Sequence, residues 1–201
     1  SQGAMNSLNP VARVRAQIED ALRDHGVKLN QRERAARIGD LLQRVGLPRT
    51  AAEMYPHELS GGMKQRACIA IAICLQPKVI IADEPTSALD VVVQRQVMET
   101  LETLRAELGA SVILIGHDMG LMAQTVARVG VMYAGDFVEM GEVEDLFSEP
   151  LHPYTRLLMA SLPSLVQKQV ARGIPGLAPS LLNRPKGCPF HPRCPEVFDS
   201  C

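Results

Sequence analysis

The chain has 201 residues, with 21 Lys and Arg against 22 Asp and Glu, which leaves a formal net charge of −1. This length fits one or two domains, and the composition of 46% hydrophobic and 21% charged residues excludes disordered and collagen-like chains. Aromatic residues make up only 3%, so we expect no nucleic-acid partner, and the longest apolar run, residues 67–75, is too short to cross a bilayer.

Helices are expected in the first 75 residues. A helix is expected after Pro10, and Asn30 with Glu33 three residues later forms the pattern of a capping box for the next one. Apolar residues at helical spacing follow, and Gly46 and Pro48 then end this helix.

Strands and helices alternate from about residue 76, which indicates an α/β fold with helices packed on a mostly parallel sheet. The apolar run at residues 79–82 is typical of a buried parallel strand. After about residue 141 the chain becomes rich in Pro and is expected to be mostly loop. The expected elements after the first strand are a helix over 93–108, a strand at 111–115, a helix after Asp118, a strand pair at 129–133 and 137–140, and a helix near 154–161.

An anion site is predicted at residues 59–66, LSGGMKQR, which lead straight into an apolar helix. Ser60 is a favourable N-cap, and the bare N–H groups and dipole of a helix N-terminus attract anions. Gly61 and Gly62 each cost about 1 kcal/mol of helix propensity, which makes sense if a ligand approaches the backbone closely. A simple helix cap would explain Ser60 but not both glycines.

Asp83 and Glu84 follow the first predicted strand, at the end where ligands bind in open α/β sheets. Asp83 is suited to hold Mg²⁺, directly or through water, and Glu84 is suited to polarise a water for attack on a phosphate. The alternative is a pair of surface acids at a strand end.

Two further polar residues have both an ordinary and a functional interpretation. Asp90 follows Ser87, Ala88 and Leu89 and opens the next helix, so a plain N-cap is the ordinary interpretation. His117 follows the second predicted strand, where it is either structural or a donor to a γ-phosphate.

In this order, the motifs resemble those of the nucleotide-binding subunit of ABC transporters. The match runs through the signature sequence at 59–66, the Walker B strand at 79–84, the D-loop at 87–90 and the switch histidine, His117. Gln2 resembles the Q-loop glutamine. The resemblance implies a P-loop NTPase fold, with the remnant of a mostly parallel sheet, an α-helical subdomain and a loop-rich C-terminal extension.

The resemblance also implies ATP and Mg²⁺ as ligands, bound between two such domains that meet head to tail. The implied roles are nucleotide binding in trans for Ser60, Gly61, Gly62 and Gln65, magnesium coordination for Asp83 and Gln2, catalysis for Glu84, His117 and Gln2, and the D-loop for Asp90.

The chain lacks one motif that the family pattern contains, the P-loop. A P-loop needs a Gly-Lys pair, and none occurs in this chain. We therefore expect an N-terminally truncated piece of a longer protein, which does not hydrolyse ATP by itself. Met63 stands where the family most often has Gln, although the peptide-importer branch often carries Met there.

Residues 131–141 and 150–158 resemble the extension of dipeptide and oligopeptide importer ATPases, a branch that includes importers of nickel and other solutes. The implied partners are a second ATPase subunit, identical or different, membrane permease subunits and, indirectly, an extracytoplasmic solute-binding protein. The implied location is the cytoplasmic face of a bacterial or archaeal membrane. A soluble ABC ATPase without a transport role is the alternative.

We divide the chain into a Q-loop and helical part (1–75), a Walker B, D-loop and switch part (76–140) and the importer extension (141–201).

The extension ends in Cys188, Cys194 and Cys201, and metal binding is favoured over stable disulfides in a cytosolic protein. His191 would complete a tetrahedral zinc site, whereas thiolates suit an iron–sulfur cluster. The resemblance favours a [4Fe-4S] cluster, because the extension in peptide importers carries four cysteines; three free thiols are the alternative.

Overall fold

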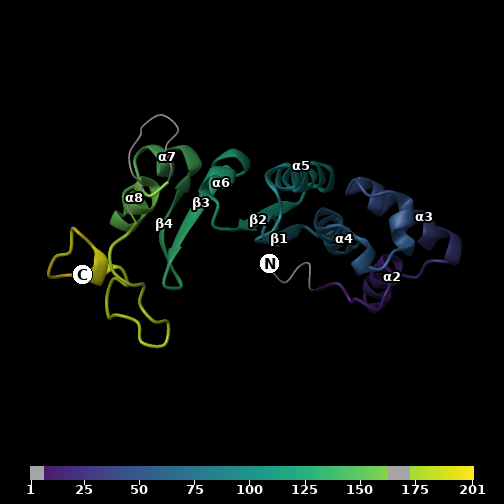
Figure 1. Cartoon of the computed structure of the whole chain (residues 1–201), viewed down its shortest axis with the longest axis horizontal. Coiled ribbons are helices and arrows are strands. Elements are labelled where there is room, and N and C mark those ends of the chain that lie inside the picture. The colour runs from purple at the N-terminus through teal and green to yellow at the C-terminus, as the bar shows by residue number, and fades with distance from the viewer. Residues whose placement is uncertain (1–6, 163–172) are drawn as a thin grey trace. The chain divides into compact units, whose positions relative to one another are not determined.

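The computed structural model describes residues 7–162 and 173–201 (Figure 1). The chain divides into two units after His117. Gln2 lies outside the described residues. The divisions at residues 75 and 140 that the motifs suggest stay predictions. No helix within the described ranges is both long enough and apolar enough to span a membrane.

The first unit begins with a helical layer whose core holds Ile18, Leu42 and Ile73, all fully buried. The capping box is confirmed, because Asn30 Oδ1 accepts the backbone N–H of Glu33 and Glu33 Oε2 accepts that of Asn30, each at 2.9 Å. The elements of this layer are α2 (Val14–Asp24), α3 (Gln31–Arg44), the 3-10 turns η1 (Arg49–Glu53) and η2 (Pro56–Glu58), and α4 (Gly61–Ile73).

The same unit holds a two-stranded parallel sheet of β1 (Val79–Asp83) and β2 (Ser111–Ile115), connected through α5 (Val91–Leu108). The register places Asp83 opposite Ile115. The expectation of a buried strand is only half right, because one face of each strand is covered and the other is not. Ile80 and Ala82 are buried, whereas Val79, Ile81, Ile113 and Ile115 are about half exposed or more.

The second unit is built on an antiparallel hairpin, which confirms the predicted strand pair (Figure 1). Ala134 and Gly135 both have positive φ values, of 49° and 89°, as the tight turn of a two-residue hairpin requires. Val129, Val131 and Leu146 form its buried core. The elements are α6 (Met119–Thr125), β3 (Arg128–Tyr133), β4 (Asp136–Glu142), α7 (Val143–Ser148), α8 (Pro153–Ala160) and the 3-10 turn η3 (His191–Arg193).

Candidate functional site

The predicted anion site lies at the N-terminus of α4. Ser60 caps this helix, because its Oγ accepts the backbone N–H of Met63 at 3.3 Å. Ser60 is exposed, Gly61 is half-buried and Gly62 is buried. Ser60 and Gly61 are therefore accessible at a helix end whose dipole favours an anion.

Gly62 has a packing role that the sequence did not reveal. A β-carbon at this position would lie 2.5 Å from Cγ1 of Val93 in α5, which is far inside van der Waals contact. Gly62 therefore lets α4 and α5 approach closely, and the ligand explanation is needed only for Gly61. Gln65, which follows on α4, is also buried.

The predicted carboxylate pair lies at the C-terminal edge of the parallel sheet. β1 ends at Asp83, and the backbone N–H of Glu84 donates to the carbonyl of Ile115, the last residue of β2, at 2.8 Å. Glu84 adopts φ 46°, a left-handed conformation that is uncommon outside glycine and concentrates at functional sites.

The Glu84 carboxylate meets His117, the predicted switch residue. Nδ1 of His117 lies 3.3 Å from Oε1 of Glu84, with side chains that are 81% and 34% exposed, respectively. Because β1 and β2 are parallel, their C-terminal ends bring Asp83, Glu84 and His117 to one edge. The structure thus brings His117 to the carboxylate pair, from which it is separated by more than thirty residues in the sequence.

Asp90 caps α5, which confirms its ordinary interpretation. Its Oδ1 accepts the backbone N–H groups of Val92 and Val93, both at 3.0 Å. The preceding Ala88 has φ 61°, so the predicted D-loop is the second place near the sheet edge where a non-glycine residue is left-handed. The D-loop role of Asp90 in a dimer stays a prediction.

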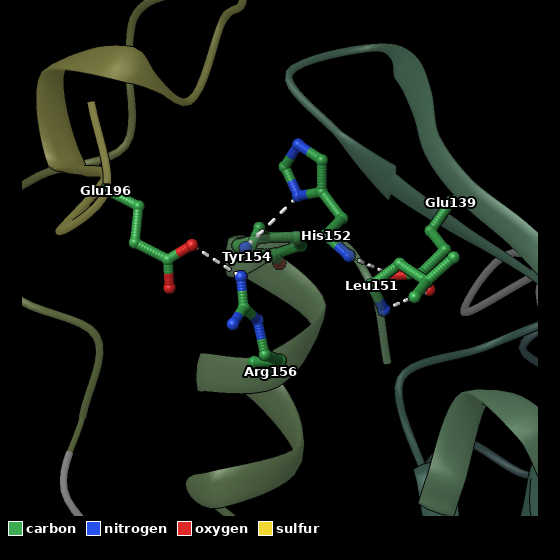
Figure 2. Close-up of polar contacts among 6 residues, drawn as sticks. All are labelled: Glu139, Leu151, His152, Tyr154, Arg156 and Glu196. Atoms are coloured by element: carbon green, nitrogen blue, oxygen red, sulfur yellow. Dashed lines mark hydrogen bonds and ion pairs between the residues drawn. The ribbon is translucent and has the colours of Figure 1, made fainter. Parts of the chain in front are cut away.

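The His-Pro-Tyr segment of the extension is held by Glu139 of β4. This carboxylate accepts the backbone N–H of Leu151 at 2.7 Å and that of His152 at 3.0 Å (Figure 2). Nδ1 of His152 in turn accepts the backbone N–H of Tyr154 at 3.1 Å and caps α8. The cap requires an unprotonated Nδ1, and sequence spacing alone carried no sign of Glu139.

The environment shifts both titratable groups toward the forms that make these bonds. Burial lowers the pKa of His152, and nearby Arg156 lowers it further against the opposing effect of Glu139. Burial would raise the pKa of Glu139, but Thr155 and the two backbone N–H groups lower it below its usual value. The Thr155 hydroxyl is buried and has no formed hydrogen bond among the described residues.

An aromatic cluster anchors the cysteine-bearing tail on the second unit. Phe190 is fully buried, with ring centroids 5.2 Å from Tyr133, 5.3 Å from Tyr154 and 6.0 Å from His152. An ion pair of 2.7 Å joins Arg156 of α8 to Glu196 of the tail (Figure 2). The tail therefore packs on the hairpin and α8.

The predicted metal centre is not supported. Cys188, His191, Cys194 and Cys201 all lie within the described ranges, yet these ranges hold no group of three or more His, Cys, Asp or Glu side chains placed to bind a metal. Zinc needs four donors converging within about 2.0–2.3 Å, which this arrangement does not supply. Neither the zinc site nor the [4Fe-4S] cluster fits the residues as they lie.

Two parts of the chain match known families. Residues 3–87 match the family described as "ABC transporter", and residues 138–201 match "Oligopeptide/dipeptide transporter, C-terminal region". These ranges contain the signature sequence with the carboxylate pair, and the His-Pro-Tyr segment with the cysteine tail, respectively.

Relatives match over the whole length of this chain. A putative peptide import ATP-binding protein of Brucella abortus is 49% identical over 100% of this chain and 61% of its own length. The dipeptide transport ATP-binding protein DppD of Escherichia coli is 45% identical over 100% of this chain and 62% of its own length. The chain thus spans about three fifths of the length of these relatives.

Solved structures share the fold. The protein cbiO1 of Clostridium perfringens, part of an ABC transporter complex, matches with a TM-score of 0.63 and 30% identity over 73% of this chain and 57% of that one. A dimeric ATP-binding cassette bound to ADP and Pi matches with a TM-score of 0.60 and 28% identity over 68% of this chain and 59% of that one.

Proposed function

Because this chain belongs to the ABC transporter family, in the branch with the oligopeptide/dipeptide C-terminal region, we propose that it is part of an ATPase subunit that powers peptide uptake. The observation that carries the proposal is the joint occurrence, in one chain, of the Glu84–His117 pair at the sheet edge and the His-Pro-Tyr extension. We expect the first to serve ATP hydrolysis, and the second lies in the range that matches the oligopeptide/dipeptide transporter C-terminal region.

The sheet edge supplies the groups that phosphoryl transfer needs. Carboxylate oxygens are the ligands that Mg²⁺ prefers, so Asp83 fits a magnesium ion, which when bound neutralises charge on the phosphates. Glu84 would accept the proton of the attacking water. His117 lies within reach of Glu84 and would orient that carboxylate or turn to the γ-phosphate.

The N-terminus of α4 supplies the complementary half of a site. Ser60 and Gly61 present an exposed helix end, and the sheet-edge groups of a second subunit would face it across one nucleotide. Catalysis would then need two subunits, identical or different, docked on permease chains at the cytoplasmic face of a bacterial membrane. Peptide as the substrate rests on the names of the relatives and on the extension.

The proposal is tested in the full-length protein, assembled with its permease, by comparing Glu84→Gln with Glu99→Gln, a change on the exposed surface of α5. Glu84→Gln should lower phosphate release about 10²–10⁴-fold and abolish peptide uptake, because the general base is lost. Glu99→Gln should leave both unchanged. Wild-type rates in Glu84→Gln would refute the assignment of the base.

A second measurement concerns the 201-residue chain itself. Because it contains no Gly-Lys pair, it lacks the loop that cradles the phosphates, and we expect it neither to bind Mg-ATP tightly nor to hydrolyse it. Equilibrium titration with a fluorescent ATP analogue measures this. Tight binding by the chain alone would show that its phosphate contacts are complete.

A further inference from the structure

The side chain of Gln94 lies against the predicted D-loop at the start of α5. Its amide nitrogen donates to the backbone carbonyls of Thr86 and Leu89, both at 3.2 Å. Because both partners are acceptors, the amide must present its NH₂ group to them, and each of its two hydrogens has a partner. One side chain thus bonds the segment 86–89 at both of its ends.

The place of Gln94 on α5 directs its side chain to this segment. Asp90 is the N-cap of α5, and the backbone N–H of Gln94 donates to the Asp90 carbonyl at 2.8 Å, which places Gln94 one turn into the helix. Side chains on a helix point back toward its N-terminus, so Gln94 reaches over the first turn toward the residues that precede it. Gln94 is half-buried, which limits the competition of water for its two bonds.

The bonded segment contains a residue whose conformation has to be held by its surroundings. Ala88 lies between the two bonded carbonyls and has φ 61°, a left-handed conformation that is uncommon for a residue with a side chain. Ala88 is exposed, so packing of its own methyl group does little to hold it. Such conformations persist where neighbouring contacts impose them, and the two bonds from Gln94 are contacts of this kind.

The same segment continues from the backbone of the predicted general base, Glu84. The N–H of Ser87 donates to the Glu84 carbonyl at 3.1 Å, and the N–H of Leu89 donates to the Thr86 carbonyl at 3.3 Å, which makes two successive turns. Gln94 bonds Thr86 where these turns overlap. A shift at this point would therefore move both the Glu84 backbone and the D-loop.

From these contacts we propose that Gln94 is a positioning residue for ATP hydrolysis, which holds the D-loop and the Glu84 turn in the geometry that the reaction needs. The inference rests on the proposed function, because it takes Glu84 as the general base. Gln94 acts through the backbone and does not have to touch the nucleotide. A displacement of about 1 Å in a catalytic constellation costs about 10²-fold in rate, so the loss of two bonds outside the site is measurable.

Variants of the full-length protein, assembled with its permease, separate the two bonds from the shape of the side chain. Gln94→Met keeps the length of the side chain and removes both donors, whereas Gln94→Lys restores donors on a longer stem. Gln96→Met, the same change at an exposed position of α5, is the matched control. ATP hydrolysis gives kcat and KM, and amide hydrogen exchange reports local order independently of turnover.

We expect Gln94→Met to lower kcat about 10–10²-fold and to change the KM for ATP less than about 2-fold, because positioning is lost while the phosphate contacts remain. The amides of Ser87 and Leu89 should exchange faster, whereas that of Met63 at the start of α4 should not, since only general unfolding would speed all three. Gln94→Lys should recover most of both losses, and Gln96→Met should match the wild type.

Three results would overturn the positioning role. The first is unchanged exchange at Ser87 and Leu89 in Gln94→Met, and the second is faster exchange there with a wild-type kcat. The third is an equal loss of kcat in Gln94→Met and Gln94→Lys, which would show that the shape of the side chain matters and its donors do not.

Glu84→Gln in the same assembly separates this proposal from the proposed function. If Glu84→Gln abolishes hydrolysis and Gln94→Met leaves kcat unchanged, the general base stands and only the positioning role of Gln94 fails. If Glu84→Gln hydrolyses ATP at the wild-type rate, the assignment of the base fails, and the positioning role falls with it.

Discussion

The carboxylate of Glu139 accepts the backbone N–H of His152, whose own imidazole caps the helix that follows (Figure 2). Two titratable groups in series therefore fix the entry into α8. His152 makes its bond only as the neutral ring with a bare Nδ1, and Glu139 accepts both backbone N–H groups, one on each oxygen, best as the carboxylate. This relationship makes the stability of the second unit sensitive to acid.

We expect the second unit to lose stability in two steps as the pH falls. The folded-state pKa of His152 is lowered, so its contribution is complete above the usual histidine value of about 6.5 and is lost as the pH falls toward the folded value. The pKa of Glu139 is also lowered, so its contribution is lost only below the usual Glu value of about 4.3.

Hydrogen exchange at the Tyr154 amide, followed against pH, measures the first step. His152→Asn keeps a capping side chain that does not titrate, so it should remove the first step and leave the second. Glu139→Gln should remove the second step. A wild-type profile that is flat from pH 7 to 5 would contradict the role of the imidazole cap.

The contact between Gly62 and Val93 predicts that Gly62→Ala lowers the stability in the wild type but raises it when Val93 is replaced by Ala. Gly62→Ala should destabilise the first unit by about 1–3 kcal/mol, because the new methyl group overlaps Val93 in a packed helix pair. In a Val93→Ala background the same change should stabilise by up to about 1 kcal/mol, the ordinary helix propensity difference. Urea unfolding of the wild type, the two single variants and the double variant gives the four stabilities of this double-mutant cycle. Destabilisation in both backgrounds would show that Val93 is not the obstacle.

Two positions with nearly the same positive φ predict opposite effects of substitution on stability. Ala88 has φ 61° and Gly109 has φ 60°. Because the left-handed conformation costs an L-residue about 1–2 kcal/mol, Ala88→Gly should stabilise by about 1 kcal/mol or less once the entropy of glycine is counted. Gly109→Ala should destabilise by about 1 kcal/mol through strain alone, since a β-carbon there would meet nothing within 4 Å. Thermal unfolding measures both, and changes of equal sign would contradict the conformational argument.

Local signals carried the predictions that succeeded. The Asn30–Glu33 box and the hairpin turn at Ala134 and Gly135 depend on residues a few positions apart, so their chemistry is visible in the sequence. The Gly62–Val93 contact joins residues 31 positions apart in different helices, and Glu139 reaches His152 across 13. Such pairings depend on how elements pack, which spacing does not encode.

The prediction of a metal site in the cysteine tail is unsupported for a related reason. The spacing of Cys188, His191, Cys194 and Cys201 predicted a metal site, but spacing carries no information on whether the side chains converge. The loop is positioned by the burial of Phe190 and by the three acceptors of Arg193. Phe190 and the Tyr133 acceptor contact the hairpin and α8, whereas the carbonyls of Ile174 and Pro175 lie in the loop before the tail.

The uneven burial of β1 predicts very different costs for two neighbouring isoleucines. Ile80 is 6% exposed and Ile81 is 66% exposed. Ile80→Ala should therefore destabilise this chain by about 2–5 kcal/mol, whereas Ile81→Thr, which keeps a β-branched side chain, should change stability by less than about 0.5 kcal/mol. Urea unfolding at several protein concentrations measures both. A large loss in Ile81→Thr, together with a wild-type stability that falls as the protein is diluted, would mean that this apolar face is buried against a second copy, since parallel sheets are ordinarily covered on both faces.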